Sequence, residues 1–177
     1  MKIGLFTDTL PDLVLDELLP AVADMGIECL EFGTGNWSRV PHLNLDDLLN
    51  SDVQRREFQA KINDHGLSIC ALNCSGNQLL PGNDGDKQRE VVRKTVQLAR
   101  LLEVDRIVMM SGLPPAPGDS HPNWITTAFE PGQREILAHQ WEQVAIPYWQ
   151  DLVGFAKNEG VNRICLEIHG VQLVYNP

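Results

Sequence analysis

The chain has 177 residues, enough for a single domain (residues 1–177) with its own core but too few for two independent domains. Its composition, 43% hydrophobic and 21% charged, is that of a globular protein, and a formal charge of −10 without any Lys- or Arg-rich segment argues against nucleic acid as a partner. No apolar run approaches the roughly 20 residues that span a bilayer, and the acidic N-terminal segment is unlike a signal peptide, so we expect no membrane contact and a cytoplasmic location.

The first half of the chain alternates short apolar runs with amphipathic helical patterns. Gly26 and Gly66 follow two of the helical patterns, where glycine commonly ends a helix. The predicted order is a strand at residues 2–7, a helix at 15–25, a strand at 28–32, helical segments at 45–49 and 53–65, and a strand at 68–73.

The second half continues the same alternation. Apolar residues at helical spacing predict a helix over residues 86–102, followed by a strand at 106–110. A long loop rich in Gly and Pro comes next, then a helix from about residue 133 to 158 that Pro147 is expected to kink or divide, and a fifth strand at 163–168. Helices between successive strands require crossover connections, so we predict a parallel sheet built from right-handed βαβ units.

Two architectures remain, an open doubly wound sheet and part of an eight-stranded barrel. The first strand-to-helix turn, FTDTLPDL, has no glycine that would let a pyrophosphate approach, which argues against a dinucleotide-binding sheet. A barrel of about 250 residues uses roughly 31 residues per unit. We therefore predict an α/β fold, an incomplete parallel (β/α) barrel of TIM type with about five of the eight βα units.

Polar side chains at the predicted strand ends are the candidate functional residues. Glu167 lies in the otherwise apolar fifth strand, where an unpaired carboxylate would be costly, so it should face a cation, a basic group or water. It is our first candidate for a metal ligand and a proton-transferring group, against the alternative of a structural ion pair. Side chains alternate along a strand, so His169 shares its face and is a candidate second metal ligand or substrate contact, against the alternative of a structural histidine.

Other candidate substrate contacts follow the remaining strands, each with a structural alternative. Glu31 and His42 lie in and after the second strand, Asn73 and Ser75 end the third, and Trp124 lies in the long loop, where an aromatic ring can form a wall for a sugar. Turn formation, ion pairing or surface packing would explain them equally simply. The four cysteines lie in or beside apolar runs and are expected to be buried free thiols.

Several segments together resemble a known family. KIGLFTD, CLEFGTGNWS, ALNCSGN, the MSG and PNW of the fourth unit, and LEIH occur in order and resemble the sugar phosphate isomerase/epimerase group of the xylose isomerase-like barrels. The resemblance implies a divalent ion (Mn, Mg, Co or Zn) bound by carboxylates and a histidine, with Glu167 in the place of the first glutamate ligand. It further implies a sugar, keto-sugar or cyclitol isomerase or epimerase that transfers a proton through an enediolate-like intermediate.

The chain departs from this pattern in length. The other metal ligands of such enzymes come from later strands, so we expect the remaining ligands outside this chain and the 177 residues alone to be inactive. A non-catalytic half barrel, completed by a partner or by self-association through its open edge, is the alternative. Sugar dehydratases or lyases and zinc-dependent apurinic-site endonucleases share the barrel, but the charge of −10 disfavours the latter.

Overall fold

The computed structural model of the protein describes residues 1–177 and contains a five-stranded parallel sheet with helices between the strands. The elements follow in this order: β1 (Gly4–Phe6), η1 (Thr7–Thr9), α1 (Leu15–Asp24), β2 (Cys29–Gly33), α2 (Leu45–Asn50), α3 (Asp52–Asp64), β3 (Ser68–Asn73), α4 (Gly82–Leu101), β4 (Arg106–Met110), α5 (Gln133–Ala138), η2 (His139–Ala145), α6 (Ile146–Asn158) and β5 (Arg163–Glu167). None of the helices combines the length and apolar character that crossing a bilayer requires.

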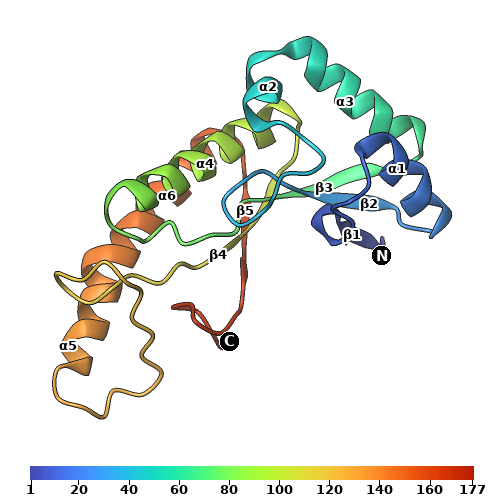
Figure 1. Cartoon of the computed structure of the whole chain (residues 1–177). Coiled ribbons are helices and arrows are strands. Elements are labelled where there is room, and N and C mark those ends of the chain that lie inside the picture. The colour runs from blue at the N-terminus through green and yellow to red at the C-terminus, as the bar shows by residue number, and fades with distance from the viewer.

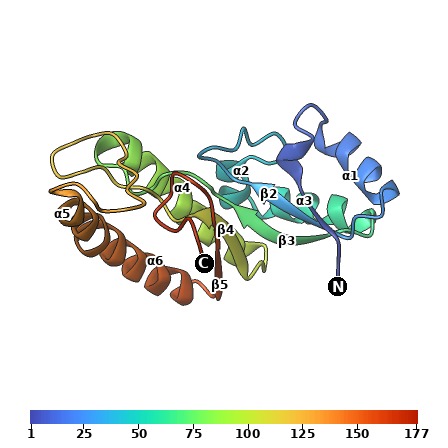
Figure 2. The same cartoon turned by 90° about the horizontal axis from the view of Figure 1, so that it is seen from below.

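The strands lie in sequence order, β1-β2-β3-β4-β5, and every neighbouring pair is parallel. A doubly wound sheet reverses its strand order at a switch point, whereas a barrel adds each new strand beside the last. Helices α1 and α3 lie at one end of the sheet, and α4 and α6 lie at the other (Figure 1; Figure 2). The prediction of an incomplete parallel barrel with five strands is confirmed.

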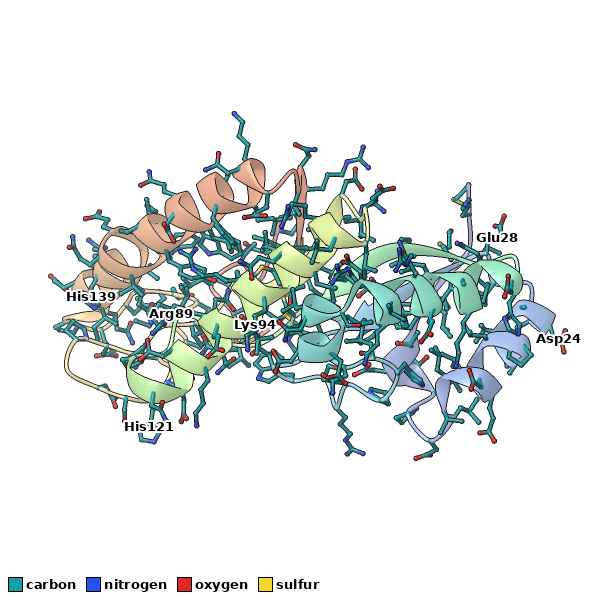
Figure 3. The ribbon with its side chains drawn as sticks, turned by 90° about the horizontal axis from the view of Figure 1, so that it is seen from above. Asp24, Glu28, Arg89, Lys94, His121 and His139 are labelled. Atoms are coloured by element: carbon teal, nitrogen blue, oxygen red, sulfur yellow. The ribbon has the colours of Figure 1, made fainter.

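One hydrophobic core of 22 buried residues joins the sheet to its helices. The side chains of Leu30 and Phe32 in β2 and of Leu72 in β3 point into it and are fully buried, because successive residues of a strand face opposite sides of the sheet. Phe32 meets Phe58 of α3 edge to face, with 5.1 Å between ring centroids. Ion pairs join the helices outside this core: Lys94 of α4, labelled in Figure 3, contacts Asp46 of α2 at 2.9 Å.

The predicted boundaries differ from the structure at several ends. Strand β1 is shorter than predicted, because the chain turns into the 3₁₀ helix η1 at Thr7. Helix α4 begins at Gly82, four residues before the predicted start, although Gly is a poor helix former. Strand β2 begins and ends one residue later than predicted, and β5 ends at Glu167.

The edge strand β5 is much more open than the central strands. It pairs only with β4, and Leu166 and Ile168, which alternate with Glu167 along the chain, are 36% and 49% exposed. Cys165 is exposed for the same reason, so the expectation of four buried thiols is wrong at this position, although all four cysteines are free. Cys70, at the register shift between β2 and β3, is half-buried, and its sulfur lies beside Cys29, close to Gly4 of β1.

Candidate active site

A cavity of about 290 Å³ lies where the carboxyl ends of the five strands converge. Every strand contributes to it, and η1 and the loops after β2 and β3 complete the walls. Its lining residues are Phe6, Asp8, Glu31, Trp37, Ser38, Asn73, Ser75, Met110 and Glu167. Carboxyl ends of parallel strands are where barrel enzymes carry their reactive groups, so this carboxylate cavity is the candidate active site.

The sheet curvature brings Glu31 of β2 and Glu167 of β5 to one cavity. In a flat sheet, strands three positions apart lie roughly 14 Å from each other. Here the two carboxyl groups line the same cavity and repel each other electrostatically. Neither is joined by a basic side chain, because the lining contains no Lys, Arg or His. The arrangement is a pair of acidic groups facing a shared space, a geometry suited to holding and moving a proton.

Asn73 at the end of β3 fixes the position of Glu31. Its Nδ2 donates a hydrogen bond to Glu31 Oε1 at 2.7 Å, and its Oδ1 accepts from the Ser75 N–H at 2.8 Å. Burial raises the pKa of the Glu31 carboxyl, the hydrogen bond from Asn73 opposes that rise, and the charge of Glu167 raises the pKa further. Glu31 is therefore easier to protonate than an ordinary glutamate, as a proton-carrying group in an active site should be.

Two oxygen atoms of the cavity residues have unused hydrogen-bonding capacity. Asp8 Oδ1 and Ser75 Oγ are buried, and neither has a hydrogen-bond partner in the protein. Gly33 makes room for the Asp8 carboxylate, because a Cβ at position 33 would lie 2.7 Å from Asp8 Oδ1 and 2.1 Å from Ser38 Oγ. Sugar hydroxyl groups are donors that could satisfy such acceptors.

The structure brings four of the predicted site residues together: Glu31, Asn73, Ser75 and Glu167 all line the carboxylate cavity. Sequence reasoning did not single out Asp8, Ser38, Phe6 or Met110. The position of Asp8 directly after the first predicted strand could have marked it as a site residue. Asp is common in turns, so we interpreted it as part of the first strand-to-helix turn.

Three predicted substrate contacts lie outside the lining of this cavity. The His169 side chain is exposed, and its Nδ1 lies 2.6 Å from Gly170 O. His42 belongs to the loop after β2 and is buried, and its Nε2 lies 3.0 Å from Leu13 O, which is a structural position. Trp124 lines a different cavity and packs edge to face on Tyr175, with 5.8 Å between ring centroids.

The chain alone does not assemble a complete metal site. No group of three or more His, Cys, Asp or Glu side chains is close enough to hold one ion. Divalent cations that prefer oxygen ligands bind six or more of them, so Glu167 could serve as one ligand but not as a site.

Sheet order and an acidic cavity at the strand ends define a barrel of the TIM class, in which chemistry occurs at the carboxyl face of the strands. The sequence model of one family, described as "Xylose isomerase-like TIM barrel", matches residues 19–177. The chain belongs to this family.

Individual relatives agree with this assignment. The chain is 48% identical over 180 residues to the uncharacterized protein YfiH of Bacillus subtilis (strain 168), and it covers 58% of that protein. Among solved structures, it resembles the probable 3-DHS dehydratase AsbF of Bacillus anthracis, with a TM-score of 0.60, 14% identity and coverage of 96% of this chain and 53% of that one. It also resembles D-psicose 3-epimerase of Clostridium cellulolyticum H10, with a TM-score of 0.56, 19% identity and coverage of 95% and 52%. The chain thus spans little more than half the length of these relatives.

Proposed function

We propose that the protein containing this chain is a sugar, keto-sugar or cyclitol isomerase or epimerase, and that its substrate binds in the carboxylate cavity. The observation that carries the proposal is the shared cavity of Glu31 and Glu167, two acidic groups from strands that are not neighbours. One can remove a proton from the carbon beside a carbonyl and the other can return it, which passes through an enediolate-like intermediate. Membership of the xylose isomerase-like family and likeness to a D-psicose 3-epimerase support this chemistry.

The part of the cavity that these five strands build also favours a neutral polyhydroxyl part of the substrate over a phosphate group. It contains three carboxylates and no cationic side chain, so a phosphate against these five strands would be repelled. Asp8 Oδ1 and Ser75 Oγ are free to accept hydrogen bonds from sugar hydroxyls, and Trp37 offers an aromatic face. We further propose that Glu167 contributes one ligand to a divalent ion whose other ligands lie outside these residues. Such an ion would polarise the substrate carbonyl.

Deuterium exchange tests the proposal. The full-length product of the gene is incubated in D₂O with Mn²⁺ and a panel of neutral ketohexoses and keto-cyclitols, and NMR follows deuterium entry at the carbon beside the carbonyl. We expect exchange with at least one compound, and Glu167→Gln should slow it by about 10²–10⁴-fold. Glu57→Gln, the same substitution on an exposed residue of α3, is the matched control and should leave the rate unchanged.

Two results would contradict the proposal: no exchange with any compound, or equal exchange by wild type and Glu167→Gln. Loss of water from the substrate, seen in the same spectra, would instead indicate the dehydratase chemistry named for the AsbF neighbour.

A non-catalytic half barrel is the second candidate. Leu166 and Ile168 on the edge strand β5 are exposed, and no complete metal site is present. A half barrel of this kind would run as a metal-free dimer or larger complex in gel filtration with metal analysis, whereas the enzyme would carry metal.

A further inference from the structure

A second cavity, of about 230 Å³, lies between the long loop after β4, the segment η2 and the residues that follow β5. It shares no lining residue with the carboxylate cavity. None of its lining side chains carries a charge, and three of them are the aromatic rings of Trp124, Trp141 and Tyr175. We call it the aromatic cavity. Its character is opposite to that of the acidic site at the strand ends.

Gln140 leaves a buried hydrogen-bond acceptor in the wall of the aromatic cavity. Its side chain is fully buried, and its Nε2 donates to Pro114 O at 2.7 Å and to Asn123 O at 2.6 Å. These two carbonyls fix the amide orientation, because a flipped amide would place oxygen against oxygen. Gln140 Oε1 is then buried without any partner in the protein. A buried acceptor without a donor costs free energy, so a bound group should supply the donor.

The local backbone around Gln140 is unusual. Residues His139–Ala145 form a π-helix, in which the Ile146 N–H bonds to Trp141 O. The segment ends at Ala145, two residues before Pro147, which has no N–H to offer to the preceding turn. Single π-helical turns occur frequently at functional sites. Figure 3 labels His139, the residue at which this segment begins.

Other lining residues of the aromatic cavity supply a donor and an aromatic surface. Gln172 is 3% exposed, and its Oε1 accepts from the Gly112 N–H at 2.9 Å, while no hydrogen bond in the protein uses its Nε2. Tyr175 donates its hydroxyl hydrogen to Thr126 O at 3.2 Å, which fixes the ring against Trp124. The aromatic cavity thus presents one free acceptor, one free donor and a ring wall.

We propose that the aromatic cavity is a binding site for a neutral, hydroxyl-bearing ring compound of monosaccharide size. One ligand hydroxyl donates to Gln140 Oε1, Gln172 Nε2 donates to a ligand oxygen, and the C–H face of the ring packs on Trp124. The volume lies below the roughly 300–1,000 Å³ of pockets for larger ligands, which limits the ligand to about one ring. The absence of charged lining residues disfavours phosphates and carboxylates.

Methyl β-D-glucopyranoside is a suitable probe, because its blocked anomeric carbon cannot open to the carbonyl form that the proposed isomerase reaction needs. The glucoside is titrated into the full-length protein while NMR follows the Gln140 side-chain amide and fluorescence follows the tryptophans. We expect saturable binding with millimolar affinity and a shift of the Gln140 amide signals. The Trp124 side chain is 43% exposed, so the Trp124→Ala variant should still fold. It is expected to weaken glucoside binding about two- to tenfold.

Two controls separate this site from the proposed active site. Trp37→Ala removes the exposed tryptophan of the carboxylate cavity, and Glu167→Gln removes its strand-end carboxylate; both should leave glucoside binding unchanged. No saturation up to about 0.1 M glucoside would overturn the proposal. So would equal binding by wild type and Trp124→Ala, or amide shifts confined to residues of the carboxylate cavity.

Discussion

The two cavities of this protein are built in different ways. The carboxylate cavity is made mainly by the ends of five hydrogen-bonded strands, and it gathers Asp8, Glu31 and Glu167 from distant parts of the sequence. The aromatic cavity is made by a loop, a π-helical segment and the chain after β5, and it contains no charge. A rigid sheet can hold like charges close together because its hydrogen bonds fix the backbone, whereas the loop-built site depends on a few buried amides.

The largest loss of stability should come from removing the Gln140 side-chain amide in the wall of the aromatic cavity. Gln140→Leu deletes two hydrogen bonds and leaves the Asn123 carbonyl without a donor, while the Pro114 carbonyl keeps only the Asn123 N–H at 3.3 Å, so we expect a loss of about 2–4 kcal/mol in the free energy of unfolding. Urea denaturation measures it. Ser75→Ala in the carboxylate cavity is the control, because Ser75 Oγ has no partner to lose, and its stability should change by less than about 0.5 kcal/mol. Equal losses would mean that the loop-built site does not depend on Gln140.

A smaller loss of stability is expected from adding a methyl group at Gly33, beside the carboxylate cavity. Gly33→Ala places a methyl group within 2.1 Å of Ser38 Oγ and 2.7 Å of Asp8 Oδ1, so both side chains must move, at a cost of about 1–3 kcal/mol. Gly154→Ala is the matched control: it lies exposed in α6 with nothing near its Cβ position, and it should stabilise the protein by about 0.5–1 kcal/mol. Thermal unfolding compares the two. An unchanged unfolding temperature for Gly33→Ala would show that the Ser38 and Asp8 side chains can move aside without loss of stability.

The smallest effect concerns the pH dependence of stability. Burial and the charge of Glu167 keep the pKa of Glu31 above its ordinary value, although Asn73 opposes this rise. The folded state therefore retains the proton to higher pH than the unfolded state, and this contribution to stability is lost as the pH rises through the folded pKa. Glu31→Gln cannot ionise, so its free energy of unfolding should fall less than that of wild type between about pH 4 and pH 7.

Urea unfolding at several pH values measures this difference. The exposed Glu57→Gln variant should follow the wild-type pH dependence. Identical slopes for wild type and Glu31→Gln would mean that burial and the charge of Glu167 do not raise the pKa of Glu31 in the folded state.

The sequence predicted the strands and the side chains on them better than the positions of the side chains in loops. Strands β3 and β4 have the predicted bounds, because their apolar runs are flanked by clear turn and helix signals. The same alternation placed Glu31 and Glu167 on the face opposite the apolar residues, and both line the carboxylate cavity. His42, Trp124 and His169 lie elsewhere, because the position of a loop side chain depends on packing that has no sequence period.

The sequence by itself determined the order of elements, the parallel pairing and the presence of acidic residues at strand ends, because these follow from local periodicity and from the crossover rule. Only the tertiary structure decided which of those residues meet. The curvature of the sheet brings β2 and β5 to one cavity, and the fold of the long loop over the π-helical segment creates a second one. Both depend on contacts between residues far apart in the chain, which no local pattern records.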